Sequence, residues 1–455
     1  MIEKMKPSGI AWIGDIPVGW DIKKIKYVIQ NDADGIKVGP FGSALTNEVV
    51  SGEEGQYKIY GQANLIRKDF NYGDNFVAEE NYRRLINYEV LPDDIAVSMM
   101  GTIGKCAVVP HGIQPGIMDS HLIKIRLSKK MNPRFFEYIY ESCVVYEQLV
   151  VNSKGSIMNG LNSTIVKSVF LAVPSFSEQT AISDFLDAQC AKIDSVIADI
   201  EKQIETLQKY KKSLITEMVT NGLDRSVPMK DSGIEWIGKI PAGWKTSRVK
   251  YLIDGKHPYP IGDGDHGMIK ADDYLDEGIP YIRVLNLTWG DGLNLDNLVF
   301  ISDKMNAMIK NSELRPNDIL IAKTGATIGK TAIVPESLPI SNTTSHVGKI
   351  TLPDTHCAKY FFYVMTSNIV QKQIQDISAM QSTRPELGIE GMRDLVVVVP
   401  PLNTQQRIAD YLDDRCTKTD AILKTKIAQL EVVKKHKASI IYEYVTGKKR
   451  VTEVN

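Results

Sequence analysis

The strongest constraint on this chain is an internal duplication. Met5–Ile29 reads MKPSGIAWIGDIPVGWDIKKIKYVI and Met229–Ile253 reads MKDSGIEWIGKIPAGWKTSRVKYLI, so 15 of 25 positions are identical at an offset of 224 residues. Later matches keep nearly the same offset: Thr102–Lys105 with Thr327–Lys330, Ser120-His121 with Ser345-His346, and Ile182–Asp194 with Ile408–Asp420. Solenoid repeats are far shorter, at roughly 20 to 50 residues. The duplication therefore predicts two similar halves in one chain, and it favours a target with two-fold symmetry.

Composition narrows the class of protein. The 455 residues allow about three or four domains, and 43% hydrophobic residues is ordinary for a globular protein. No apolar run reaches the roughly 18 residues that span a bilayer and no signal-peptide pattern is present, so we expect a cytoplasmic protein. The five cysteines show no CxxC pair, which argues against a disulfide framework or zinc site. A net charge of −1 excludes coating of nucleic acid by bulk positive charge, but it allows a local basic groove.

Each half has a Trp-rich opening, a region of mixed character and a long helix. Short apolar runs separated by turn residues predict a small α+β domain in each half. We expect the first mixed domain at 1–176, the first long helix at 177–222, the second mixed domain at 223–402, and the second long helix with a basic tail at 403–455. The fold class is therefore α+β, with two similar mixed α/β domains in a pseudo-two-fold arrangement.

The long helices carry a coiled-coil pattern. Residues 179–220 contain no Pro or Gly, and apolar residues recur in alternating steps of four and three. The first seam is Ile193, Ile197, Ile200, Ile204, Leu207, Lys211, Leu214 and Met218. The weaker second seam is Thr419, Leu423, Lys426, Leu430, Val433, Lys437, Ile440 and Tyr444. A helix this long with one apolar face needs a partner, and the other copy supplies it, so we predict an antiparallel coiled coil.

The two Gly-rich turns allow three interpretations. Gly325–Thr331 resembles a phosphate-binding P-loop but is one residue short, and Gly101–Cys106 is shorter and lacks the hydroxyl that would hold magnesium. A tight turn that presents Lys105 and Lys330 to DNA phosphates is the second interpretation. A purely structural turn is the third. The adjacent His121 and His346 are interpreted as hydrogen-bonding residues rather than bases or metal ligands.

Other motifs have plain structural interpretations. Asn132–Phe135 partly matches the [DN]PP[YFW] motif of amino-methyltransferases, but it lacks the second Pro, and no Gly-rich loop for a methyl donor follows a strand. We therefore expect a helix start with Pro in its first turn. Four tryptophans, Trp12, Trp20, Trp236 and Trp244, are predicted to be packing anchors against the long helices or against a partner. Cys190 and Cys416 are predicted to be small buried apolar residues.

The mixed domains differ where polar residues follow a strand. Gly61–Arg67 (GQANLIR) stands roughly where Tyr281–Leu287 (YIRVLNL) stands in the second half. Arg, Asn and Gln are side chains that read guanine and adenine edges in the major groove. The residues predicted near base edges are Gln62, Asn64, Arg67, Arg283 and Asn286, and those predicted near phosphates are Thr102, Lys105, Thr327 and Lys330. The alternative, that these are ordinary polar residues at strand edges, stays open.

With these residues in view, the chain resembles the DNA-specificity subunit of type I restriction–modification systems over essentially its whole length. The resemblance rests on the duplicated SGIxWIGxIPxGW opening, the twin TIGK turns, and the blocks Pro174–Leu186 and Pro400–Leu412 that begin the long helices. It implies two target-recognition domains that alternate with helical regions, and a bipartite DNA site whose gap depends on helix length. In this sequence the seam lysines Lys426 and Lys437 leave the register open, and a basic tail at 448–450 is a candidate contact with DNA or a partner.

The resemblance also implies a complex. Two modification subunits would bind the helical regions, use S-adenosylmethionine and methylate a flipped adenine in double-stranded DNA. Restriction subunits that translocate with ATP and Mg would complete the nuclease. The chain itself would be non-catalytic and would bind none of these cofactors. The chief alternative is an interaction scaffold that bridges two identical partners without reading DNA, and an enzyme with its own site is disfavoured by the missing motifs.

Overall fold

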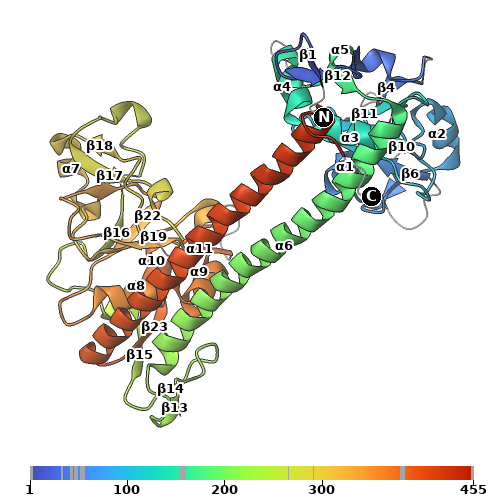
Figure 1. The fold of residues 1–455 in the computed structure, drawn as a ribbon. Coiled ribbons are helices and arrows are strands. Elements are labelled where there is room, and N and C mark those ends of the chain that lie inside the picture. The colour runs from blue at the N-terminus through green and yellow to red at the C-terminus, as the bar shows by residue number, and fades with distance from the viewer. Residues whose placement is uncertain are drawn as a thin grey trace. The chain divides into compact units, whose positions relative to one another are not determined.

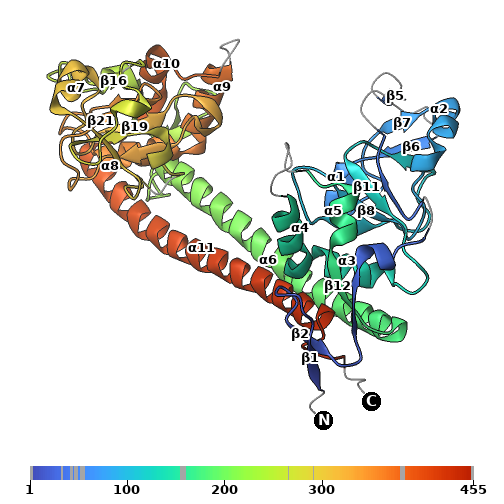
Figure 2. The same ribbon diagram turned by 90° about the horizontal axis from the view of Figure 1, so that it is seen from above.

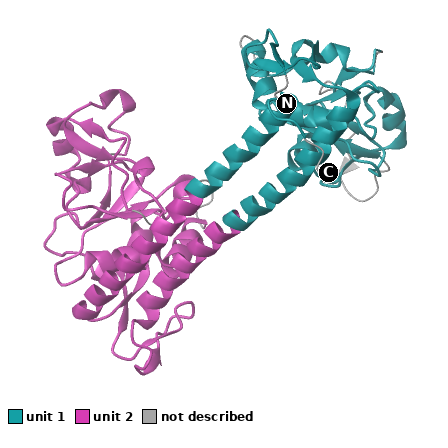
Figure 3. Cartoon of the chain, in the orientation of Figure 1, with its two compact units in different colours: residues 1–200, 428–455 teal, residues 201–427 magenta. Residues whose placement is uncertain are grey.

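The chain forms two compact units. The computed structural model describes residues 4–31, 34–40, 45, 50–51, 57–153, 160–264, 266–289, 292–379 and 385–451. Unit 1 comprises residues 1–200 and 428–455, and unit 2 comprises residues 201–427 (Figure 3). Two long helices, α6 (Phe176–Asn221) and α11 (Leu402–Val445), each contribute one segment to each unit (Figure 1).

Unit 1 is a mixed α/β structure. Its strands are β1 (Met5–Pro7), β2 (Asp15–Pro17), β3 (Asp21–Lys24), β4 (Ile36–Val38), β5 (Val50–Ser51), β6 (Tyr57–Tyr60), β7 (Asn75–Val77), β8 (Ile95–Ser98), β9 (Cys106–Val108), β10 (Gly116–Met118), β11 (Leu122–Ile125) and β12 (Phe170–Val173). Its shorter helices are α1 (Gln62–Arg67), α2 (Glu79–Arg84), α3 (Pro133–Glu141), α4 (Cys143–Ser153) and α5 (Ser163–Ser168), with single 3-10 turns at η1 (Ile25–Tyr27) and η3 (Ile86–Tyr88).

Unit 2 contains the same kinds of element. Its strands are β13 (Met229–Asp231), β14 (Lys239–Pro241), β15 (Lys245–Arg248), β16 (Ile261–Asp263), β17 (Ile279–Ile282), β18 (Val299–Ile301), β19 (Ile319–Ala322), β20 (Thr331–Ile333), β21 (Asn342–Thr343), β22 (Val347–Ile350) and β23 (Val396–Val399). Its helices are α7 (Asp303–Met308), α8 (Ala358–Thr366), α9 (Asn368–Ala379) and α10 (Ile389–Asp394), and its 3-10 turns are η4 (Val249–Tyr251), η5 (Ala271–Asp273), η6 (Val284–Asn286), η7 (Lys310–Ser312) and η8 (Gly325–Thr327).

The sheets of the two units follow one plan. The order β4-β11-β8-β9 in unit 1 matches β16-β22-β19-β20 in unit 2, and β10-β6-β7-β5 matches β21-β17-β18. The pairs β10–β6 and β21–β17 are both parallel. Two-stranded ladders repeat as well, β1-β2 with β13-β14 and β12-β3 with β23-β15. The predicted fold class, with two similar mixed α/β domains and long helices, is confirmed.

Hydrophobic burial explains why these strands lie at the centre of each unit. Every residue of β8, β11, β19 and β22 is buried, as expected for short apolar runs with both faces covered. In unit 1, α3 packs against β9, and in unit 2, α8 packs against β19 and β20. Figure 2 shows α8 close to β19. Asn132 begins α3 by accepting hydrogen bonds from the backbone N–H groups of Arg134 and Phe135. The predicted helix start with Pro in its first turn is therefore confirmed.

A glutamine fixes the start of each long helix. Gln179 accepts a hydrogen bond from the Asn132 backbone N–H at 2.8 Å and donates one to the Pro174 carbonyl at 3.0 Å. Gln405 accepts from the Cys357 backbone N–H at 2.9 Å and donates to the Pro400 carbonyl at 2.8 Å. Both side chains are buried, so each tethers a long helix to the mixed domain that precedes it.

Within each unit the segments of α6 and α11 pack antiparallel. In unit 1 the rings of Phe185 and Tyr444 pack in a tilted arrangement with centroids 4.4 Å apart, and Lys437 Nζ lies 2.6 Å from Asp194. In unit 2 Lys211 Nζ lies 2.5 Å from Asp420. The predicted seam positions are buried or half-buried, whereas most positions between them are exposed. Lys211 and Lys437 keep their seam places because a carboxylate on the facing helix neutralises each of them.

A glycine and a tryptophan close the end of each long helix. Gly222 and Gly447 end α6 and α11 with φ of +77° and +71°, which glycine adopts without strain. A Cβ at Gly447 would lie 3.2 Å from the Trp20 ring, and one at Gly222 would lie 2.9 Å from the Trp244 ring. Trp20 and Trp244 are buried, so both are packing anchors as predicted.

The other two tryptophans are exposed, and their packing against a partner stays a prediction. Trp12 and Trp236 are 41% and 51% exposed, because they stand in the turns that join β1 to β2 and β13 to β14. The basic tail is tied to unit 1: Lys448 Nζ donates to the Ile13 carbonyl at 2.8 Å and Arg450 lies 2.5 Å from Glu178. Cys190 and Cys416 are buried, as predicted. Within the described residues, no helix is both long and apolar enough to span a bilayer.

Candidate nucleic-acid interface

One asparagine builds the same loop in both units. After β6, Asn64 accepts a hydrogen bond from the Gly61 backbone N–H at 2.9 Å and donates to the Tyr72 carbonyl at 2.7 Å. After β17, Asn286 accepts from the Arg283 backbone N–H at 2.9 Å and donates to the Asn294 carbonyl at 3.0 Å. Both side chains are buried. The structure thus gives each amide a role in shaping the loop, and base contact by Asn64 or Asn286 stays a prediction.

The structure brings Gln62 and Thr102 together in unit 1. Gln62 Nε2 lies 2.7 Å from Thr102 Oγ1, 2.6 Å from the Met100 carbonyl and 2.9 Å from Ser98 Oγ. The loop that follows β6 is thereby joined to the first Gly turn. The predicted base-edge and phosphate groups of this domain therefore lie side by side.

Arg67 stands at the end of α1 and stacks on an aromatic ring. Its Cζ atom lies 4.1 Å from the centroid of the Tyr72 ring, and Tyr72 is exposed. Stacking holds the planar guanidinium in one orientation while its edge remains able to donate hydrogen bonds. Arg67 was predicted from the sequence, but Tyr72 was not.

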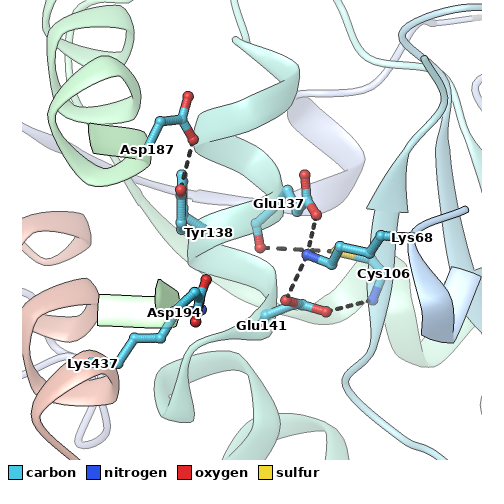
Figure 4. A network of polar contacts seen from close by, with 8 residues as sticks. All are labelled: Lys68, Cys106, Glu137, Tyr138, Glu141, Asp187, Asp194 and Lys437. Atoms are coloured by element: carbon cyan, nitrogen blue, oxygen red, sulfur yellow. Dashed lines mark hydrogen bonds and ion pairs between the residues drawn. The ribbon is translucent and has the colours of Figure 1, made fainter. Parts of the chain in front are cut away.

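The next residue, Lys68, anchors this helix to α3 (Figure 4). Its ammonium group contacts Glu137 and lies 3.1 Å from Glu141, and the Cys106 backbone N–H donates to Glu141 at 3.3 Å. Burial lowers the pKa of Lys68, but Glu141 and Glu137 outweigh burial and raise it overall. In α8, which matches α3 in length, the corresponding fifth and ninth residues are Phe362 and Thr366, so this network belongs to unit 1.

A second set of contacts in Figure 4 is repeated in unit 2. Tyr138 donates to Asp187 at 2.6 Å, and Tyr363 donates to Asp413 at 2.7 Å. Arg134 pairs with Asp187, and Lys359 pairs with Asp413. These contacts join the helix after the central sheet to the long helix. They are present in both units, so they belong to the frame, by which we mean the strands and helices that the two units share, and not to the surface where the units differ.

The Gly turns have matching backbones but differ by one residue. Gly101 and Gly104 have φ of +74° and +84°, and Gly325 and Gly329 have φ of +72° and +88°. Lys105 is exposed and Lys330 is half-buried. Thr327 Oγ1 donates to the Thr324 carbonyl at 3.3 Å, which closes the second turn on itself. Contact of both lysines with DNA phosphates stays a prediction.

The histidines beside the turns are hydrogen-bonded, as predicted. His121 Nδ1 lies 3.4 Å from Asp119 Oδ2, and His346 Nδ1 lies 3.0 Å from Thr324 Oγ1. Both follow a serine and stand just before a fully buried strand, β11 or β22.

Unit 2 presents different side chains around its loop. Arg283 donates to the Asn297 carbonyl at 3.1 Å, and its Cζ atom lies 5.5 Å from the centroid of the Tyr274 ring. Its buried Nε atom has no hydrogen-bond partner among the described residues. Trp289 is exposed and bridges to Thr331, next to Lys330. An exposed Trp beside a candidate phosphate contact was not anticipated from the sequence.

A surface hollow in unit 1 brings Tyr72 and Asp119, which were not predicted from the sequence, together with Gln62 and Asn64. Its lining includes Gln62, Asn64, Tyr72, Asn75, Asp119 and His121. The His121 backbone N–H donates to Asp119 Oδ1 at 2.8 Å. Burial raises the pKa of the Asp119 carboxyl, although His121 acts in the opposite direction. The position of Asp119 directly before the Ser-His pair was the available signal, but its proximity to residue 61 depends on the parallel pairing of β6 with β10.

Several exposed apolar positions are copied in both repeats. The pairs are Met5 and Met229, Trp12 and Trp236, Tyr27 and Tyr251, Phe176 and Leu402, and Val196 and Ile422. Tyr27 is 67% exposed and Tyr251 is 74% exposed. Exposed aromatic residues are enriched where proteins meet partners, so duplication of such positions favours two equivalent docking surfaces.

The fold and the site define a class: a tandem protein with two mixed α/β domains of one topology, long helical segments, and different polar surfaces on the same loops. A protein-family model described as "Type I restriction modification DNA specificity domain" matches residues 46–206 and 263–432, which is more than half of the chain. The chain belongs to the family of type I restriction–modification DNA-specificity proteins, whose domains recognise DNA sequence.

The chain is similar to known type I specificity subunits over most of its length. The chain is 24% identical over 343 residues to the type I restriction enzyme EcoBI specificity subunit of Escherichia coli, covering 74% of this chain and 69% of that protein. It is 22% identical over 449 residues to the MjaIX specificity subunit of Methanocaldococcus jannaschii, covering 97% and 96%. A solved structure described as showing complex assembly and conformational transition of the type I R-M system matches with a TM-score of 0.66 and 15% identity, covering 95% and 99%. This last similarity concerns the fold.

Proposed function

We propose that this chain recognises a bipartite DNA site, with unit 1 reading one short half-site and unit 2 reading a different one. The observation that carries the proposal is a loop built by the same asparagine in both units but surrounded by different side chains, Gln62, Arg67 and Asp119 in one and Arg283 and Trp289 in the other. Equal frames with unequal polar surfaces fit two different short sequences. The lengths of α6 and α11 would set the gap between half-sites.

Within each half-site, the chain would make two kinds of contact, one with phosphates and one with base edges. Lys105 and Lys330, with Thr102 and Thr327, would contact phosphates from the Gly turns and fix the register on the duplex. Arg67 and Arg283 would contact guanine edges in the major groove, where a guanidinium can donate two hydrogen bonds to O6 and N7. Gln62 would position the first turn through Thr102 and approach a base with its remaining amide oxygen.

The chain would act through partner subunits. The copied exposed residues, Tyr27 with Tyr251 and Trp12 with Trp236, support two equivalent copies of one partner. We propose that these partners are modification subunits that carry S-adenosylmethionine and methylate adenine, and that restriction subunits use ATP and Mg. The chain itself would supply recognition without catalysis.

The test is a comparison of DNA methylation in cells with and without this gene, by single-molecule sequencing. The proposal expects methylation to disappear at one bipartite adenine motif when the gene is deleted and to return on complementation. An unchanged pattern, in cells where an active partner methyltransferase is verified, would contradict DNA recognition. That result would favour an interaction scaffold that uses the copied apolar positions alone.

A further inference from the structure

The two units carry different residues at two equivalent positions, where a pair of parallel strands ends. In unit 1, β6 ends before Gly61 and β10 ends before Asp119, whose backbone N–H donates to the Tyr60 carbonyl at 2.9 Å. In unit 2, β17 ends before Arg283 and β21 ends before Thr344, whose backbone N–H donates to the Ile282 carbonyl at 3.2 Å. Gly61 therefore corresponds to Arg283, and Asp119 corresponds to Thr344.

From this exchange, and resting on the proposed function, we propose that Asp119 is a specificity-determining residue that accepts a hydrogen bond from an exocyclic amino group in the major groove, cytosine N4 or adenine N6. Carboxylates accept from such amino groups, whereas the major-groove edges of guanine and thymine present oxygen or nitrogen acceptors to it. The same carboxylate therefore selects one class of base and rejects the other.

The surroundings of Asp119 support contact with a ligand. Its side chain is 24% exposed and lines the hollow that also contains Gln62 and Tyr72. Among the described residues, the group that pairs with it is His121, whose ring nitrogen lies 3.4 Å from Oδ2 and whose backbone N–H holds Oδ1. The carboxylate is thus oriented by one oxygen, while the other has a long contact and can accept a further hydrogen bond.

Gly61 keeps this carboxylate accessible. A Cβ built at residue 61 would lie 2.7 Å from Asp119 Oδ2, closer than a real Cβ contact allows. In unit 2 this place is held by Arg283, and the buried hydroxyl of Thr344 has no hydrogen-bond partner among the described residues. Unit 1 therefore has a carboxylate after β10 and no side chain at residue 61, whereas unit 2 has a hydroxyl after β21 and a guanidinium at residue 283.

On a DNA-binding surface, a carboxylate that makes no contact with the DNA reduces the binding affinity. Phosphates repel an anion on a DNA-facing surface, and binding grows with the number of phosphates that cations neutralise. A carboxylate in the hollow that also contains Gln62 and Tyr72 weakens that attraction unless it gains a hydrogen bond from the DNA. We therefore expect Asp119 to contribute to discrimination rather than to overall affinity.

The test uses the full chain assembled with its modification subunits and a library of random duplexes. The variants are Asp119→Asn, which keeps an oxygen for the His121 backbone, and Asp119→Thr, which carries the residue of the second unit. The matched control is Asp93→Asn in the same unit, because Asp93 also pairs with a histidine, His111 at 3.3 Å, but does not line the hollow. Thermal unfolding of each variant verifies the fold.

The expected result is a change at one position of one half-site. Wild type should require cytosine or adenine there, and both Asp119 variants should lower the ratio of A or C to G or T by about 10- to 100-fold. The other half-site and the Asp93→Asn profile should not change, and the affinity of the Asp119 variants for random DNA should stay the same or rise, because a negative charge is removed. Wild-type preference in both Asp119 variants, or equal losses on specific and random DNA, would overturn the inference. A wild-type complex without any sequence preference would instead overturn the proposed function itself.

Discussion

The two mixed α/β domains use the same residues to hold the loop backbone, but they present different residues on the surface around that loop. Asn64 and Asn286 close the same loop with the same pair of hydrogen bonds. Three residues before each asparagine, Gly61 in one domain becomes Arg283 in the other, and at the end of the neighbouring strand Asp119 becomes Thr344. The comparison teaches that buried polar groups are conserved within the duplication because leaving their partners unsatisfied is costly, whereas solvent-facing groups on the same frame are free to differ.

The largest expected effect comes from the tryptophans that close the long helices. Trp20→Ala and Trp244→Ala should each lower the free energy of unfolding by about 3–5 kcal/mol, because each removes a buried aromatic side chain. Trp12→Ala, at an exposed turn position, should change it by no more than about 0.5 kcal/mol. Chemical denaturation measures all three. If Trp20→Ala strongly lowered the free energy of unfolding and Trp244→Ala did not, the two tryptophans would not have equivalent roles in stability.

The loop asparagines come next. Asn64→Ala and Asn286→Ala should each destabilise by about 1–3 kcal/mol, since each leaves buried backbone groups without a partner. Amide hydrogen exchange should show faster exchange at the Gly61 or Arg283 N–H in the matching variant. If either variant kept its stability but lost base preference, that asparagine would read DNA rather than build the loop.

The two helix–helix ion pairs sharpen the comparison at smaller energies. Lys211, whose side chain is 10% exposed, pairs with Asp420, and Lys437, at 30%, pairs with Asp194. Lys211→Met should cost about 1.5 kcal/mol and Lys437→Met less than about 1 kcal/mol, because exposure weakens the second pair. Thermal unfolding in low and high salt measures both. Equal losses, or a larger loss for Lys437, would contradict the burial argument.

The smallest effects concern the turn lysines. Lys105→Ala and Lys330→Ala should each weaken binding to specific and random DNA to the same extent and reduce the salt slope of log K by about 0.9, the value for one lost phosphate contact. Binding titrations at several salt concentrations measure this. If a variant lost affinity for the specific site but not for random DNA, that lysine would contact a base edge rather than a phosphate.

The sequence predicted the strands and helices shared by the two units better than it predicted the residues on the candidate DNA-binding surface. The duplicated opening and the seam of the long helices depend on local periodicity, and Gln179, Gln405 and the buried cysteines followed the repeat. Residue type alone did not show that Trp12 and Trp236 are exposed at hairpin turns while Trp20 and Trp244 are buried. Asp119 and Tyr72 were missed because a parallel strand pairing and a loop closure bring them to Gln62 and Arg67, and neither is visible in local sequence. The identities of the base-reading residues stay predictions.

The most direct test of two domains reading two half-sites is the methylated motif of cells that carry Arg67→Ala or Arg283→Ala in place of wild type. The account predicts that Arg67→Ala relaxes positions in one half-site only and Arg283→Ala positions in the other only, each with about 1–3 kcal/mol less discrimination. Relaxation of the same half-site by both variants, or equal loss of methylation at every site without any change of motif, would contradict it.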